Sequence, residues 1–157
     1  MSAFIPRPDL DLIDLLLGEH ACLLSLLRHV EMRLPAMNLG EMQVSGEALE
    51  AALMAHAIEE DHLLFQALPL EQAGVQETLQ AMFGEHNEQR AMLAELREHT
   101  EEPRARGLLL RLIELTREHF AVEERILFGL AKQALSDERR SELGGEFARR
   151  RGLSRAY

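Results

Sequence analysis

Four long stretches of this chain carry apolar residues at alternating steps of three and four, the spacing that gives an α-helix one apolar face. Pro35 follows the first stretch, Pro69 follows the second, and Pro103 marks the turn before the fourth. Amphipathic helices bury their apolar faces against one another, and mostly short connections favour antiparallel neighbours. The pattern therefore predicts an all-α, up-down-up-down antiparallel four-helix bundle.

The helix boundaries follow from capping residues and helix breakers. Residues 36 to 44, which contain Asn38 and Gly40, are expected to form a loop. The expected helices are Asp9 to about Leu34, Ser45 to about Leu68, about Val75 to Thr100, about Arg104 to Ala134, and a short additional C-terminal helix from Ser136 to about Gly152. A length of 157 residues suits one well-cored domain. We therefore expect a single domain over 1–157, with the bundle core at about 9–134 and the C-terminal helix and tail at about 136–157.

Charge and composition exclude several classes of protein. The net charge of −10 argues against nucleic-acid binding, which needs a basic surface. Aspartates interrupt the N-terminal leucines, and no apolar run approaches the roughly 18 residues of a membrane span. Cys22 is the only cysteine, which excludes an intrachain disulfide and a cysteine-based zinc site. We expect a cytoplasmic protein that binds neither nucleic acid nor membranes.

Arginines gather near the C-terminus, at residues 139, 140, 149, 150, 151 and 155. The first two of them follow Asp137 and Glu138, so the charges at this point partly cancel. This mixture favours a solvated terminal helix over a binding patch.

Histidine interrupts each apolar stripe near its centre, and in two stripes a glutamate follows four residues later. Positions i and i+4 lie about 40° apart on one helix face, so each His-Glu pair points into the bundle. A buried carboxylate without a partner costs on the order of several kcal/mol or takes up a proton. The inward residues are His20, His56, Glu60, His86, His119 and Glu123.

The same four histidines share one depth in the predicted bundle. The midpoints of the four long helices fall at about residues 21, 57, 87 and 119, and neighbouring antiparallel helices bring their midpoints to one level. The remaining histidines, His29, His62 and His99, are rotated by about 120° to 180° from the inward ones, so we expect them at or near the surface. The four inward side chains should therefore converge on one site.

Six nitrogen and oxygen donors exceed the four that a tetrahedral zinc needs, and two carboxylates able to bridge suit a pair of metals. A dinuclear iron or manganese site follows. The Glu-x-x-His pairs of ferritin-type sites are absent from these faces, which argues against iron storage or ferroxidase chemistry. A core histidine bonded to a carbonyl or carboxylate is the simpler explanation for any one of these residues. Four histidines at one depth, with two inward carboxylates, favour the metal site.

Four short segments carry the inward residues: Gly18-Glu19-His20, His56-Ala57-Ile58-Glu59-Glu60, Glu85-His86-Asn87-Glu88 and His119-Phe120-Ala121-Val122-Glu123-Glu124. Their order over about residues 10 to 134 resembles the hemerythrin-like, or HHE cation-binding, family. The resemblance implies a non-haem di-iron site in which Glu60 and Glu123 bridge the metals and the histidines are terminal ligands. The implied cofactor is two iron ions, oxo- or hydroxo-bridged, with manganese or zinc as other occupants.

The chain departs at position 90 from what the resemblance implies for oxygen-carrying members of the family. In those members a further histidine follows four residues after the third-helix histidine, and the fourth helix carries an aspartate instead of a glutamate. Here the residue is Arg90, which cannot ligate a metal. It either pairs with Glu60 or Glu123, holds an anion, or extends to the bundle end. The missing ligand opens a position for O2, NO, peroxide or water and argues against reversible oxygen carriage.

Three functions are consistent with the sequence. The first is a di-iron module that binds or senses O2, NO or peroxide, or that reports iron availability by folding around the metal. The second is an enzyme that uses the same residues on O2, peroxide or NO, for which no separate catalytic residue is assigned. The third is a metal-free helical interaction domain.

Overall fold

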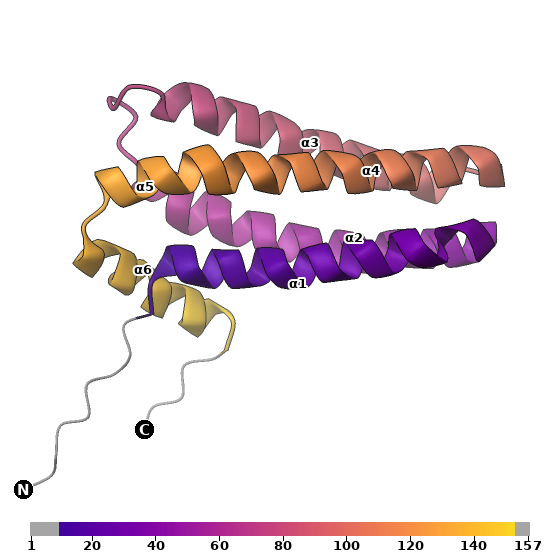
Figure 1. The fold of residues 1–157 in the computed structure, drawn as a ribbon, viewed down its shortest axis with the longest axis horizontal. Helices are drawn as coiled ribbons and strands as arrows, with labels where there is room; N and C mark the ends of the chain where they lie inside the picture. Colours follow the sequence, from indigo (N-terminus) through magenta and orange to yellow (C-terminus); the bar gives the residue numbers. More distant parts are fainter. Residues whose placement is uncertain (1–9, 153–157) are drawn as a thin grey trace, which may run out of the picture.

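The computed structural model describes residues 10–152, which are helical over most of their length and contain no strand (Figure 1). The predicted all-α class is confirmed. The helices are α1 (Leu12–Arg33), α2 (Leu39–Glu59), α3 (Val75–Glu98), α4 (Glu102–Val122), α5 (Phe128–Ala134) and α6 (Asp137–Arg150). Two π-helical segments extend this set: Glu60–Phe65 continues α2, and Glu123–Leu127 joins α4 to α5. None of the helices described is long and apolar enough to cross a membrane.

The long helices lie side by side, and α6 lies against one end of the assembly (Figure 1). α1 packs against α2 and α4, and α3 packs against the same two helices. α6 contacts α1 and the π-helical segment that follows α2. This arrangement leaves an interior bounded by α1 to α4, with the additional helix outside it.

The second helix begins earlier than the sequence analysis predicted. Asn38 caps it: the Asn38 side-chain oxygen accepts from the Glu41 N–H at 3.0 Å, and the Glu41 carboxylate accepts from the Asn38 N–H at 2.9 Å. This reciprocal capping box starts a helix at Leu39, so the loop predicted over residues 36–44 and the cap predicted at Ser45 are wrong. The Ser45 hydroxyl instead donates to the Glu41 carbonyl within the helix.

The other boundaries differ little from the prediction. Asp11 caps α1 by accepting from the Ile13 N–H at 2.8 Å, whereas the predicted cap, Asp9, lies outside the described residues. Pro103 lies in the first turn of α4, where its missing N–H has no helical partner to lose. Ser136 caps α6 as predicted, accepting from the Arg139 N–H at 3.1 Å.

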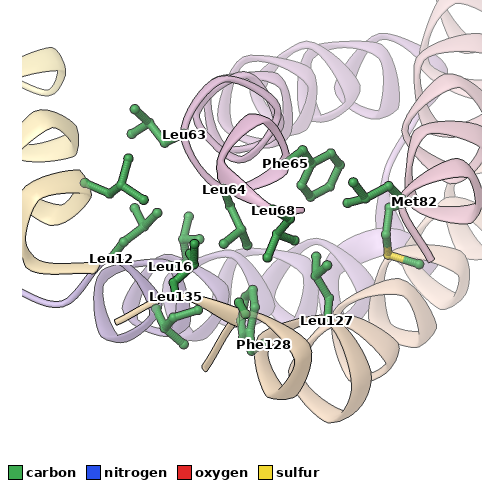
Figure 2. Close-up of a cluster of buried hydrophobic side chains, with 14 of the residues drawn as sticks. Leu12, Leu16, Leu63, Leu64, Phe65, Leu68, Met82, Leu127, Phe128 and Leu135 are labelled. Atoms are coloured by element: carbon green, nitrogen blue, oxygen red, sulfur yellow. The ribbon is translucent and has the colours of Figure 1, made fainter. Parts of the chain in front are cut away.

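Two apolar clusters fill the interior, and α1 and α3 contribute to both. α2 and α4 belong mainly to one of them, and the chain reaches the other through the π-helical segments that follow these two helices. Figure 2 shows the cluster at the α6 end, where Leu16 of α1, Leu64 and Phe128 approach one another. The second cluster occupies the opposite end of the helices and contains Leu27 and Leu112. Along each helix the predicted histidine lies at the boundary between the residues of one cluster and those of the other. A polar layer at the shared depth therefore separates two apolar layers.

α6 is solvated on one face only, because its other face packs against the bundle. It buries Leu143, Gly144 and Phe147 against the bundle. A side chain at Gly144 would collide with the Leu10 carbonyl, so this position requires glycine for the close approach of α6. The outer face of α6 remains solvated, but several of its arginines form ion pairs with the bundle, as described below.

Candidate metal centre

The six predicted inward residues converge in the polar layer, and none of them is more than 2% exposed. The three histidines expected elsewhere behave as predicted, since His29 and His62 are exposed and His99 is partly exposed. Helical periodicity and common depth thus distinguished the converging histidines from the others.

The converging side chains form two overlapping groups. His20 and His56 gather with Glu60 and Glu123, and the donor atoms of that group lie within 4.8 Å of one another. His86 and His119 form an equivalent group with the same two carboxylates. Each group offers two imidazoles and two carboxylates, and the carboxylates are common to both. The arrangement therefore offers two overlapping groups of donors, each of which could hold a metal ion.

Each of the four histidines also faces a second carboxylate, through its Nδ1 atom. The Nδ1–oxygen distances are 2.9 Å for His20 and Glu124, 2.9 Å for His56 and Glu19, 3.3 Å for His86 and Asp61, and 2.5 Å for His119 and Glu85. An ionised carboxylate can only accept, so the hydrogen of a neutral imidazole lies on Nδ1 in His20, His56 and His119, whereas the contact between His86 and Asp61 is not a hydrogen bond. The lone pair of Nε2 in these three histidines is then free and directed inward, as metal ligation requires.

The inward lone pairs oppose one another in pairs. Nε2 of His20 lies 3.0 Å from Nε2 of His56, and the same atoms of His86 and His119 are also 3.0 Å apart. Two lone pairs at this distance repel unless a proton or a cation lies between them. Nitrogens bound to one ion at about 2.1 Å and about a right angle are themselves about 3 Å apart. The residues therefore fit a metal ion at each pair.

The two shared carboxylates point to the same conclusion. Both oxygens of Glu60 and both oxygens of Glu123 are buried without a hydrogen-bond partner among the described residues. Burial raises the pKa of Glu123, and the charge of Glu60 raises it further, to about 8. Burial also acts to raise the pKa of Glu60, but the charges of His56 and the other histidines outweigh it and lower that pKa to about 2. Without a metal, therefore, a single carboxylate charge of the pair is tolerated at neutral pH.

His56 carries a proton under the same conditions. Burial acts to lower its pKa, but the Glu60 charge and the hydrogen bond to Glu19 outweigh burial and raise the pKa to about 10. A proton on His56 partly fulfils the role of a cation by relieving the contact with His20. The centre thus attracts positive charge strongly, which is the electrostatic property that a metal site needs.

Aromatic rings cover the histidines from the apolar side. Phe120 stacks on His20 with ring centroids 4.0 Å apart, and Phe128 stacks on the same histidine at 5.5 Å. Phe65 stacks on His86 at 5.9 Å. These rings fix the planes of the imidazoles and limit the access of water to the polar layer.

Comparison with known proteins agrees with this geometry. Residues 11–131 match the family model of the hemerythrin HHE cation-binding domain. The chain belongs to the hemerythrin HHE cation-binding family. No curated protein and no solved structure matches it. Family membership and the clustered histidines and glutamates together indicate a metal-binding protein.

In this HHE domain the centre is built from an internal repeat that the sequence analysis did not detect. The tripeptide Gly-Glu-His occurs at residues 18–20 and 84–86, and the pattern His-x-x-x-Glu-(Asp/Glu)-x-x-Leu-Phe occurs at 56–65 and 119–128. A π-helical segment begins at the shared glutamate in each copy. π-Helical turns are frequent at functional sites, and here both accompany residues of the centre.

The outer carboxylates were also missed, although the sequence held a signal for them. Each is adjacent in sequence to a converging residue: Glu19 precedes His20, Asp61 follows Glu60, Glu85 precedes His86, and Glu124 follows Glu123. A residue next to an inward one points about 100° away from it, toward the neighbouring helix. In this fold that neighbour carries the next histidine.

Arg90 does not contact either shared glutamate within the part of the chain that the structure describes. Its guanidinium donates to Asn87 at 3.0 Å and to the Met54 sulfur at 3.2 Å, and it lies 3.9 Å from Asp61. Asp61 in turn faces His86. Arg90 is therefore separated from the shared carboxylates by one further layer of residues, and it extends outward.

Proposed function

We propose that this protein is a non-haem di-iron protein that binds or senses a small oxidant. In this proposal the chain is one domain, an antiparallel up-down-up-down bundle with α6 added. Glu60 and Glu123 would be ligands common to both ions, His20 and His56 would complete one position, and His86 and His119 would complete the other. The observation that carries the proposal is the pair of opposed Nε2 contacts beside two shared, unpartnered carboxylates.

Several features favour iron in both positions. All donors are imidazole nitrogens or carboxylate oxygens, a set that suits iron, and the one cysteine is exposed and outside both groups. Two carboxylates common to both groups support a dinuclear centre rather than a single ion. When bound, reduced iron ions supply electrons to an oxidant such as O2, NO or peroxide.

The residues of the chain prepare the site for such a ligand. Outer carboxylates hold the imidazoles of His20, His56 and His119 in the tautomer that directs Nε2 inward. The stacked phenylalanines keep the surroundings apolar, which suits a small, weakly polar molecule. Four protein donors at each position leave coordination positions free on a six-coordinate ion. An exposed free thiol at Cys22 is typical of a reducing compartment, which supports a cytoplasmic location.

Metal analysis of the purified protein tests the proposal. Protein made aerobically with iron supplied should contain two iron ions per chain and absorb in the near-ultraviolet. The His56→Ala and His119→Ala variants should each retain one ion, because each substitution removes a ligand of one position. The His62→Ala variant should retain two, because His62 is exposed outside both groups. Absence of bound iron in the unaltered protein would contradict the proposal.

The spectrum of the loaded protein then distinguishes binding from catalysis. Dithionite should bleach the near-ultraviolet bands, and O2 or NO should restore or change them once per centre. Continuous consumption of O2, peroxide or NO that disappears in Glu60→Ala would instead identify an enzyme. The residues that hold the metals are the same in both cases.

A further inference from the structure

The outer carboxylate beside His56 differs from its counterpart beside His119, because it is held by an arginine from outside the bundle. Nη2 of Arg151 donates to one oxygen of Glu19 at 2.6 Å, and the other Glu19 oxygen accepts from His56 Nδ1 at 2.9 Å. Glu85, which faces His119, has no arginine within ion-pair distance among the described residues. A chain of two strong contacts therefore connects the end of α6 to one converging histidine only.

The local structure places Arg151 for this contact. Its backbone N–H caps the last turn of α6, and Gly152 follows with a φ of 67°, which ends the helix at this point. The Arg151 guanidinium lies 5.3 Å from the centre of the Phe147 ring and also donates to the Ala55 carbonyl at 3.1 Å. Contacts to α1, α2 and its own helix thus fix the guanidinium beside Glu19.

The neighbouring residue provides a natural control. Arg150 donates to Glu59 at 2.5 Å and lies 3.2 Å from His62 Nδ1. Neither partner is one of the six converging residues. Arg150 and Arg151 therefore both attach α6 to the bundle with one ion pair each, but only Arg151 reaches a converging histidine through its partner.

We propose that Arg151 is a positioning residue for His56, acting through Glu19. In this proposal α6 sets the metal affinity of the position that uses His20 and His56, the α1–α2 position. It does not set the affinity of the α3–α4 position, which uses His86 and His119. The inference rests on the proposed metal-binding function. Glu19 is only partly buried and can turn toward water when its arginine is removed. His56 then loses the acceptor that fixes its ring and its Nδ1 hydrogen, and loss of such an outer partner typically weakens metal binding about 10- to 100-fold.

The experiment measures each position separately in the full chain. His119→Ala leaves the α1–α2 position, and His56→Ala leaves the α3–α4 position. Adding Arg151→Met should weaken iron binding about 10- to 100-fold in the His119→Ala background, and it should leave the affinity unchanged in the His56→Ala background. Arg150→Met should change neither affinity. Equal weakening by the Arg150 and Arg151 substitutions would show that docking of α6 alone matters, and would overturn the inference.

Two further measurements separate positioning from a structural effect. Cys22 is exposed and lines one groove with Phe147 and Arg151, so its alkylation rate reports whether α6 stays docked. In a double-mutant cycle, Arg151→Met should add little once Glu19→Gln is present, because both act on His56 by one route. Additive effects of the two substitutions on iron affinity would contradict the proposal that Arg151 acts through Glu19. The cycle remains a test of that proposal even if the Arg151 variant loosens α6.

The results also separate this inference from the function on which it rests. If the unaltered protein binds no iron, the proposed function fails and the inference fails with it. If the unaltered protein binds two ions and Arg151→Met leaves both affinities unchanged, only the inference fails.

Discussion

The half of the centre formed by α1 and α2 and the half formed by α3 and α4 carry the same functional pattern in different surroundings. Each half supplies two histidines, one shared glutamate and two outer carboxylates, in the same order along the chain. Arg151, at the end of α6, forms an ion pair with Glu19, which faces His56 of the first half. In the second half, Arg90 lies 3.9 Å from Asp61, the carboxylate that faces His86. The ligand geometry is thus nearly symmetric, while its outer support is not.

This difference separates two tasks that are often combined in a metal centre. In the proposed centre the repeated residues would determine which metals bind and how many, and they lie in the long helices and the two π-helical segments. The additional helix would adjust one position without contributing a ligand. An asymmetric support of this kind makes two chemically similar positions inequivalent, which allows one metal to bind, release or react before the other.

The largest expected effect comes from replacing Glu60, a carboxylate that belongs to both groups of donors. Glu60→Gln should abolish tight metal binding at both positions, because each uses this carboxylate. The metal-free fold should survive, because Glu123, whose pKa the Glu60 charge raises, can ionise in place of Glu60 and face the same histidines. Iron at 100 times its dissociation constant should stabilise the unaltered protein by about 2.7 kcal/mol for each of the two ions and the variant not at all, as thermal unfolding with and without iron measures.

The adjacent residue serves as the control for this prediction. Glu59→Gln removes a carboxylate that pairs with Arg150 and lies outside both groups, so both ions should remain. Retention of one ion by Glu60→Gln would show that the two halves do not depend equally on the shared carboxylate.

The next largest expected effect is the dependence of iron affinity on pH. In the metal-free protein the pKa of His56 is raised to about 10 and that of Glu123 to about 8, and metal ligation requires both groups to lose their protons. Iron loading should release two protons below about pH 8 and one between about pH 8 and 10. The overall affinity should therefore rise about 100-fold per pH unit below pH 8.

Calorimetry in buffers of different ionisation enthalpy counts these protons. His56→Ala should reduce the count by one, which identifies the proton that belongs to the first half. Both pKa values lie above their ordinary values of 6.5 and 4.5, so the stabilisation from these groups is complete at low pH and declines as pH rises toward 10. The metal-free fold should lose stability over this range. An affinity that does not change between pH 6 and 8 would contradict the prediction.

The sequence predicted the converging residues because their signal is local. The i, i+4 spacing of His56 and Glu60 and the depth of each histidine depend only on helix geometry, which holds throughout the four long helices. The start of α2 was predicted wrongly because Gly40 and Asn38 favour a loop in isolation. The side chain of Glu41 reverses that preference by completing the capping box.

Other parts of the centre depend on contacts that no local pattern contains. Arg151 and Glu19 are 132 positions apart, and their contact exists only because α6 folds back along α1. The π-helical turns have no distinctive composition, although the repeated Glu-(Asp/Glu)-x-x-Leu-Phe marks both of them here. Internal comparison of the chain with itself would have found that repeat.

A smaller effect should follow from moving α6 away from the first half. Gly144→Ala places a methyl group against the Leu10 carbonyl, so α6 has to shift, at a cost of about 1–3 kcal/mol in the free energy of unfolding. Gly145→Ala meets no atom within 4 Å and should be neutral or slightly stabilising. Denaturant unfolding of the two variants makes the comparison. Similar stabilities would show that α6 does not need its close approach to the bundle.

The smallest expected effect tests whether the backbones of the two halves are equivalent outside the ion pairs that α6 forms. Gly18 and Gly84 occupy matching places in the repeat, both are exposed inside long helices, and an added Cβ meets nothing within 4 Å at either. Each Gly→Ala substitution should stabilise the fold by about 0.5–1 kcal/mol, because alanine loses less backbone entropy in a helix. Equal gains in denaturant unfolding would confine the asymmetry to Arg151 and its partners. A gain at Gly84 alone would show that α6 also constrains the backbone of α1 next to Glu19.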